Sequence, residues 1–230
     1  MLMTSDFVEI NSHKVRILKR KGQRHLRLRI NSSGNAILSM PKRLPKYMGI
    51  KYLQTKTAWL DKHTFQPKQI SFGSKLFTGQ EISIVDGSNT RNRVVISKET
   101  LEFYLQFDSN DPASQRYMSK IIKNLYIDHL SKIVSQRLDY YSDLTKLKYR
   151  DFAVKNLRSK WGSCDRHKQL KFSLYLLGVD MALIDYVVLH ELAHTKYMHH
   201  QPLFWKLCEQ YMPDYKHRQK QLKISRMNLV

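Results

Sequence analysis

Four of the ten histidines in this chain lie within eleven consecutive positions, in the segment HELAHTKYMHH at residues 190–200. His190 and His194 are four positions apart, so on an α-helix both side chains would project from one face and could bind one metal ion together. Glu191 would lie about 100° further around the helix axis, beside the two histidines rather than between them. This order of residues, HExxH, is typical of a metal site with an adjacent base.

The chemistry that the pattern predicts is hydrolysis by a metal-activated water. In catalytic sites Zn²⁺ is commonly held by three protein ligands, which leaves one position for water and lowers the pKa of that water to about 7. Glu191 would act as general base and acid, taking a proton from the water and returning it to the leaving group. We therefore expect one Zn²⁺ ion as cofactor.

An alternative interpretation is a helix whose histidines only decorate its surface. The residues around the motif argue against it, because apolar side chains cover most of the circumference of the predicted helix. A buried imidazole needs a polar partner, and a metal shared by two histidines satisfies both of them. The apolar residues are Leu183, Ile184, Val187, Val188, Leu189 and Leu192.

A third protein ligand has to come from outside the HExxH motif, and the doubled histidine at 199 and 200 offers two candidates. His200 stands ten positions after His190, as in the extended pattern HExxHxxxxxH. Pro202 is suited to the first turn of a following helix, which would place His200 in the turn between two helices. His199 would point roughly the opposite way in an extended segment. The spacing favours His200 and leaves His199 as the alternative.

The first hundred residues of the chain indicate short strands. In HLRLRI (25–30) apolar and basic residues alternate, a turn NSSGN follows, and AILSMP (36–41) returns to form a hairpin. Residues 47–63 have helical spacing. Further strands are expected at 74–77, 81–85, 93–97 and 101–107.

The second half of the chain has mainly helical spacing. A long amphipathic helix is expected from about residue 114 to residue 144, with Ser114 as its cap, and another helix would begin after Asp180. Short strands are expected at 152–154 and 170–176, separated by the loop KWGSCDRHKQ.

The turn-forming residues SNDPAS (109–114) mark the expected boundary between these two regions. We therefore predict an α+β fold in two parts. A β-rich N-terminal basic region would occupy residues 1–110, and a mainly helical domain that carries the HExxH helix would occupy residues 111–230.

The chain is strongly basic, with 40 Lys and Arg against 19 Asp and Glu and a formal net charge of +21. Such a charge favours polyanionic partners, which include DNA, RNA and nucleotides. The candidate contact residues lie on and beside the basic face of the first hairpin strand, where a solvated strand face is the alternative interpretation. They are Arg20, Lys21, Arg24, Arg27 and Arg29.

Other features of the composition narrow the class of protein. The two cysteines, Cys164 and Cys208, form no CxxC pair and give no disulfide framework. The first residues show no secretory signal, and the most apolar stretch, YLLGVDMALIDYVVL, is interrupted by two aspartates, so no membrane span is expected. We therefore expect a soluble cytoplasmic protein.

Three segments together make the chain resemble a known family. They are RSKWGSC (158–164), IDYVVLHELAHTKYMHHQPLFW (184–205) and MPDYKHRQKQL (212–222), and they resemble the YgjP-type metallopeptidases. Less specific matches at residues 15–30 and 58–63 extend the resemblance over nearly the whole chain. It implies a zincin-like, gluzincin-like catalytic domain and connects the chain, more distantly, to SprT- and WLM-type proteases that act on DNA-associated proteins.

The resemblance also bears on individual site residues. It implies that His190, His194 and His200 bind the metal and that Glu191 is catalytic, with His200 at the family's ligand position. His199 stands where the family has asparagine, so it would lie near the metal and alter the site or compete for the ion.

Several further residues are candidates for contact with substrate or for orienting the ligands. The loop at 161–164 would lie beside the metal, with backbone NH groups or Arg158 facing a substrate oxyanion, although Trp161 can equally anchor the loop in the core. Asp185 would accept a hydrogen bond from a ligand histidine or serve the start of the helix. The full set of these candidates is Arg158, Trp161, Ser163, Asp185 and His199.

The preferred interpretation is a zinc-dependent metallopeptidase that hydrolyses protein or peptide substrates, with nucleic-acid-associated proteins as candidate targets. A second interpretation, suggested by other members of the resembled family, is a metal-dependent nucleotide pyrophosphatase acting on UTP. Three histidines favour Zn²⁺ over the oxygen-bound Mg²⁺ that is usual in phosphoanhydride cleavage, which supports the peptidase. A third interpretation is a non-catalytic nucleic-acid-binding protein with a structural zinc.

Overall fold

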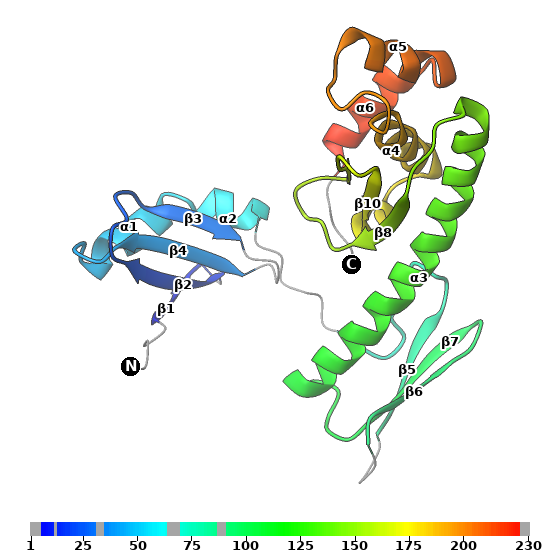
Figure 1. The fold of residues 1–230 in the computed structure, drawn as a ribbon. Coiled ribbons are helices and arrows are strands. Elements are labelled where there is room, and N and C mark those ends of the chain that lie inside the picture. Colours follow the sequence, from blue (N-terminus) through cyan, green and yellow to red (C-terminus); the bar gives the residue numbers. More distant parts are fainter. Residues whose placement is uncertain (1–5, 12, 31–34, 64–69, 87–90, 226–230) are drawn as a thin grey trace. The chain divides into compact units, whose positions relative to one another are not determined.

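The computed structural model describes residues 6–11, 13–30, 35–63, 70–86 and 91–225. The chain forms two compact units, Met1–Lys68 and Gln69–Val230. Each unit combines strands with helices (Figure 1), which confirms the predicted α+β class. No helix in the described part of the chain is long and apolar enough to cross a membrane.

The N-terminal unit is a four-stranded sheet with two helices. Its elements are β1 (Asp6–Ile10), β2 (His13–Arg20), β3 (Arg27–Ile30), β4 (Ala36–Pro41), α1 (Lys46–Gln54) and α2 (Thr57–His63), in the sheet order β1-β2-β4-β3. β3 and β4 pair antiparallel, as the predicted hairpin requires, while β2 and β4 are parallel. The helical spacing over residues 47–63 corresponds to two helices rather than one. Apolar strand residues pack against Leu53 and Leu60 of these helices in a core of their own.

The C-terminal unit begins with a three-stranded sheet that packs on a long helix. The elements are β5 (Glu81–Asp86), β6 (Arg93–Ile96), β7 (Thr100–Leu105) and α3 (Pro112–Thr145), with the sheet order β5-β7-β6. Leu101 and Phe103 of β7 share one buried core with Met118 and Ile122 of α3.

This shared core explains where the chain divides. Along the sequence, the division between the two compact units falls between Lys68 and Gln69. The sequence had predicted this boundary between residues 110 and 111. The apolar face of the β5-β7-β6 sheet needs α3 to exclude water from it, so the sheet belongs with the helical region that follows. The turn at SNDPAS therefore connects two parts of one unit.

Two local predictions in this region need correction. Residues 74–77 were expected to form a strand, but the structure has only an isolated bridge between Lys75 and Glu81. The cap of α3 is Asp111, whose side chain accepts a hydrogen bond from the backbone NH of Ala113 at 2.7 Å. Ser114 lies inside the helix and is fully buried.

A small mixed sheet follows α3. It consists of β8 (Asp151–Lys155), β9 (Gly162–Cys164) and β10 (Gln169–Ser173) in the order β8-β10-β9, so β9 is an edge strand. Residues 162–164 were predicted as loop, and the structure shows instead that they pair antiparallel with β10. The expected strand at 170–176 ends at Ser173 and continues as the 3-10 helix η1 (Leu174–Gly178).

Three helices complete the unit, namely α4 (Met181–Ala193), α5 (Pro202–Tyr211) and α6 (Tyr215–Ile224). α4 contains most of the HExxH motif and is buried at nine of its 13 residues, which confirms the prediction of a buried helix. Pro202 opens α5, as expected, so residues 194–201 form the turn between the two helices.

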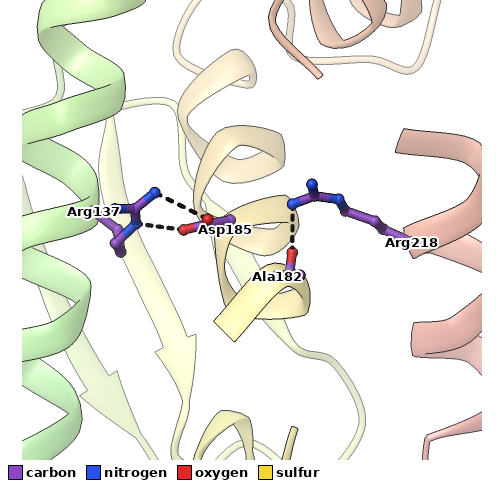
Figure 2. A network of polar contacts seen from close by, with 4 residues as sticks. All are labelled: Arg137, Ala182, Asp185 and Arg218. Carbon is purple, nitrogen blue, oxygen red and sulfur yellow. Dashed lines mark hydrogen bonds and ion pairs between the residues drawn. The ribbon is translucent and has the colours of Figure 1, made fainter. Parts of the chain in front are cut away.

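Polar contacts hold the first turns of α4 between α3 and α6 (Figure 2). Arg137 of α3 makes a bidentate pair with Asp185, in which Nη2 lies 2.9 Å from Oδ2 and Nε contacts Oδ1. On the other side, Nη1 of Arg218 donates to the carbonyl oxygen of Ala182 at 2.9 Å. The prediction that Asp185 accepts a hydrogen bond from a histidine of the motif is wrong. Its carboxylate pairs with Arg137 near the start of the helix and ties α4 to α3.

We expect Asp185→Ala to lower the free energy of unfolding by about 1–3 kcal/mol, because it leaves the half-buried Arg137 guanidinium without its carboxylate. Urea denaturation measures this change. Asp180→Ala is a matched control on the same helix, since Asp180 is exposed and its side chain makes no capping hydrogen bond. The control should stay within about 0.5 kcal/mol of the parent protein. An equal loss in both variants would contradict a specific role for the pairing with Arg137.

Candidate metal centre

Three imidazole rings converge at the C-terminal end of α4. His190 and His194 lie on successive turns, and His200 reaches them from the turn before α5. The Nε2 atom of His190 is 3.3 Å from that of His194 and 3.0 Å from that of His200. The Nε2 atoms of His194 and His200 are 3.2 Å apart. The candidate ligand atoms of these three residues all lie within 4.8 Å of one another.

These separations fit a tetrahedral metal ion. Ligands at the corners of a tetrahedron, with metal–nitrogen bonds of about 2.0–2.1 Å, lie about 3.3 Å from each other. The three observed distances, 3.0 to 3.3 Å, are close to that value. Three corners would thus be taken by nitrogen and the fourth left for another group.

The hydrogen bonds of the rings also fit ligands. Nδ1 of His194 lies 2.9 Å from the carbonyl oxygen of Tyr197, an acceptor, so this nitrogen must carry the proton. In the neutral ring Nε2 then presents a lone pair to the other two histidines. On the next turn the Tyr186 hydroxyl lies 3.5 Å from Nδ1 of His190. A metal-binding histidine typically has its second nitrogen held in this way.

Burial favours the neutral form of the His190 and His194 rings. It lowers the pKa of His190 to about 3, helped by the neighbouring rings of His194 and His200. The pKa of His194 is also lowered, mainly by burial. Because a metal binds the neutral imidazole, these rings need not lose a proton to become ligands at neutral pH.

Aromatic residues of α5 and α6 fix the ring positions. Phe204 packs against all three histidines, with its ring centre 4.6 Å from that of His194 and 4.8 Å from that of His200. Trp205 stacks on His200 at 5.2 Å, and Tyr215 stacks on the far side of Trp205 at 5.5 Å. These ring contacts limit the rotation of the three histidines, of which His200 remains exposed.

Glu191 lies beside the cluster and is only 6% exposed. Burial raises the pKa of its carboxyl to about 8, and the nearby Lys160 ammonium opposes this shift. Edge strand β9 passes against it at Gly162. A Cβ atom added to Gly162 would stand 2.6 Å from both Cγ and Oε1 of Glu191, which is closer than side-chain atoms approach. Only glycine leaves room for the carboxyl here.

A cavity of about 270 Å³ opens beside Glu191 and His190. Its walls come from the segment leading into β9, from α4 and from α6. The ammonium groups of Lys160 and Lys223 and the carboxamide of Gln219 line this cavity together with apolar side chains. The lining residues are Lys160, Trp161, Gly162, Tyr186, Val187, His190, Glu191, Gln219, Leu222 and Lys223.

The structure brings some of the predicted site residues together and separates others. His190, Glu191, His194 and His200 lie at one point, and Trp161 lines the adjoining cavity. His199 is exposed and stands outside the three-histidine cluster, so of the two adjacent histidines it is His200 that lies close to His190 and His194.

The remaining candidates occupy other positions. Arg158 is exposed, with its guanidinium carbon 5.9 Å from the centre of the Tyr175 ring. Ser163 lies in β9 opposite Lys171. Cys164, which was not among the predicted site residues, does not suit nucleophilic chemistry, because burial and the nearby Glu191 raise the pKa of its thiol to about 11. The basic candidates from Arg20 to Arg29 belong to the N-terminal unit.

Several residues of the site had no role in the sequence prediction. Phe204 and Trp205 both contact the ring of His200. Their closeness to this histidine in the sequence is a signal from which the contact could have been predicted. Gly162 lies in the loop 161–164 that was expected beside the metal, but its contact with Glu191 depends on β9 running beside α4. Gln219 and Lys223 come from α6, and nothing in their local sequence points to a site.

A family model and two solved structures are similar to this chain. The model of the family "YgjP-like, metallopeptidase domain" matches residues 24–225. Among curated proteins none matches the chain.

Two solved structures are similar over part of the chain, and both are metallopeptidase zymogens. Pyrococcus abyssi abylysin is 21% identical over 42% of this chain and 99% of its own, with a TM-score of 0.37. Methanocaldococcus jannaschii jannalysin is 22% identical over 40% of this chain and 92% of its own, with a TM-score of 0.35. Since the family model spans most of the 230 residues, the chain belongs to the YgjP-like metallopeptidase family.

Proposed function

We propose that the chain is a zinc metallopeptidase in which His190, His194 and His200 hold one Zn²⁺ ion and Glu191 moves the protons of peptide hydrolysis. The observation that carries the proposal is the convergence of three Nε2 atoms at tetrahedral spacing beside a buried glutamate. All three ligand atoms are imidazole nitrogens, which suit Zn²⁺ better than the oxygen-preferring Mg²⁺ or Ca²⁺.

The ion would supply Lewis-acid chemistry, lowering the pKa of a water and polarising the scissile carbonyl. Glu191 accepts the proton of the attacking water at a carboxylate oxygen and then gives it to the departing amine. Its burial raises the proton affinity of the carboxyl, which suits it to hold that proton between the two steps, and Lys160 favours the ionised form that begins the reaction.

Edge strand β9 is suited to position an extended substrate. It pairs with β10 on one side only, and Gly162 at its start touches the Glu191 side chain. A peptide that adds to the open edge of β9 would run past Glu191 with its backbone groups paired. A side chain of that peptide would then enter the adjoining cavity, where Lys160 and Lys223 favour an acidic group.

The same two lysines support a second candidate function. A nucleotide triphosphate is anionic, so an ammonium-lined cavity next to the metal also suits a pyrophosphatase acting on UTP. We prefer the peptidase because the family is one of metallopeptidases and the ligand set is all nitrogen.

We expect Glu191→Gln to lower kcat for casein or a peptide by at least about 10²–10⁴-fold while bound metal, measured by elemental analysis, is retained. The amide keeps the size of the carboxyl but cannot accept the proton. Assays on UTP run beside the peptide assays. Cleavage of UTP without proteolysis would replace the peptidase by the pyrophosphatase, and unchanged activity in the variant would contradict both enzymes.

His200→Ala and His199→Ala form a matched pair of adjacent histidines. Loss of a residue that only hydrogen-bonds a metal ligand weakens metal binding by about 10–100-fold. We expect His200→Ala to weaken zinc binding by more than this, because it removes one of the three proposed ligands. His199→Ala should bind zinc as the parent does. Titration with a chromogenic zinc chelator measures both affinities. Loss of zinc in the His199 variant alone would overturn the assignment of the third ligand.

Gly162→Ala tests whether β9 positions Glu191. The backbone of Gly162 is not in the left-handed region, so alanine meets only the steric clash with the carboxyl. We expect kcat to fall by about 10²-fold, since a displacement of about 1 Å in a reacting group has such an effect. Zinc content should not change.

The double variant Gly162→Ala/Glu191→Gln separates this effect from general damage. If Gly162 acts through Glu191, alanine should lower activity little further once the carboxylate has been replaced. Additive losses in the double variant would contradict the positioning role of Gly162.

A further inference from the structure

The excess positive charge is concentrated in the N-terminal unit. Residues 1–68 contain 15 Lys and Arg against three Asp and Glu, while residues 69–230 contain 25 against 16. Hydrolysis of a peptide bond does not use this charge, and the candidate metal centre lies wholly in the other unit.

Strand alternation assigns the side chains of this sheet to two faces. One face packs on α1 and α2 and supplies the core of the unit. Its buried residues are Ile10 of β1, Val15 and Ile17 of β2, and Ala36, Leu38 and Met40 of β4, which pack with Leu53 and Leu60 of the two helices.

The opposite face is basic. Residues of the other parity lie on it, and the strand register aligns Arg16 of β2 and Arg29 of β3 on either side of Ile37 in β4. Ile37 is 8% exposed although it belongs to neither of the two buried clusters, which indicates that the stems of the flanking arginines cover it. The charged and aromatic members of this basic face are Phe7, Glu9, Lys14, Arg16, Arg20, Arg27 and Arg29.

These cations have few partners in the described part of the chain. The face has five cationic side chains and one carboxylate, Glu9, which stands opposite Lys14. No described carboxylate forms an ion pair with the four arginines, and Nε of Arg16 is buried without a hydrogen-bond acceptor. Arg20, Arg27 and Arg29 are exposed. Guanidinium groups in such surroundings are available to an external anion.

We propose that this basic face of the N-terminal sheet binds single-stranded nucleic acid. Four of the five cations are arginines, whose planar groups bind phosphate through two nitrogens and stack on bases, whereas lysine acts as a point charge. Phe7 is 50% exposed at the margin of the face, with the Lys14 ammonium 5.0 Å from its ring centre, and its exposed part offers a further stacking surface. Sheet faces with basic and aromatic side chains bind splayed bases in this way.

The shape of the face favours a single strand over a duplex. Readers of the duplex major groove insert a helix or a two-stranded ribbon into it. Here both helices lie on the other face of the sheet, and the arginines stand on β2 and β3, on either side of β4. The proposal is independent of peptide hydrolysis, which takes place in the other unit.

The test uses the full chain and a fluorescein-labelled 20-nucleotide oligo-dT, with binding followed by anisotropy between 50 and 300 mM salt. We expect Arg20→Gln/Arg27→Gln/Arg29→Gln to weaken binding at least about ten-fold at 100 mM salt, and to lower the slope of log K against log salt by about 2. The control, Arg116→Gln/Lys120→Gln/Lys123→Gln, removes the same charge from an exposed face of α3 and should change binding less than about two-fold.

Two further measurements make the result decisive. The triple Arg→Lys variant at positions 20, 27 and 29 should keep the salt slope, while thermal unfolding checks that each variant is folded. Charge alone favours duplex DNA, which has about one negative charge per 1.7 Å, so tighter binding of oligo-dT than of the matching duplex supports the proposal. Equal loss in the two Gln variants, tighter duplex binding, or displacement of oligo-dT by poly-glutamate at equal charge would each overturn it.

Discussion

Three imidazole Nε2 atoms lie 3.0 to 3.3 Å from one another, a spacing at which one cation could accept a lone pair from each of them. The chain maintains it by burying the helix that carries His190 and His194 and by fixing the turn that carries His200. Tyr197 contributes its carbonyl, which sets the tautomer of His194. Phe204 packs on all three rings and limits their movement. Much of the C-terminal unit serves this one constraint.

The position of α4 follows from the same requirement. A helix that is buried around most of its circumference can be placed only by neighbours on several sides. Arg137 of α3 pairs with Asp185, Arg218 of α6 binds the Ala182 carbonyl, and β9 lies against Glu191. The polar contacts lie at the start of the helix, and His190 and His194 lie at its end. The ion pair therefore fixes the direction of the helix without competing for the histidines.

Parts of the candidate site whose residues are close in the sequence could be predicted from it. Parts that depend on contacts between distant segments could not. The helical period placed His190, Glu191 and His194 on one helix, and the spacing favoured His200. The short strand β9 was read as a loop, because three residues that include a glycine give no alternation to detect. The domain boundary was predicted at the most obvious turn, since no local pattern shows that β7 needs α3 to bury its apolar face. Lys160 and Lys223 reach the cavity from segments far apart in the chain.

The two units differ in the range over which their charges act. At the candidate metal centre, charges act over a few ångströms in buried surroundings, where one carboxyl and one ammonium decide where a proton resides. The N-terminal sheet instead has unneutralised cations at its surface, and their mutual repulsion disfavours the compact state. A neutral peptide bond does nothing to offset that repulsion. Association with a polyanion offsets it directly by releasing counterions, so the charge of this unit is better explained by a partner than by the reaction.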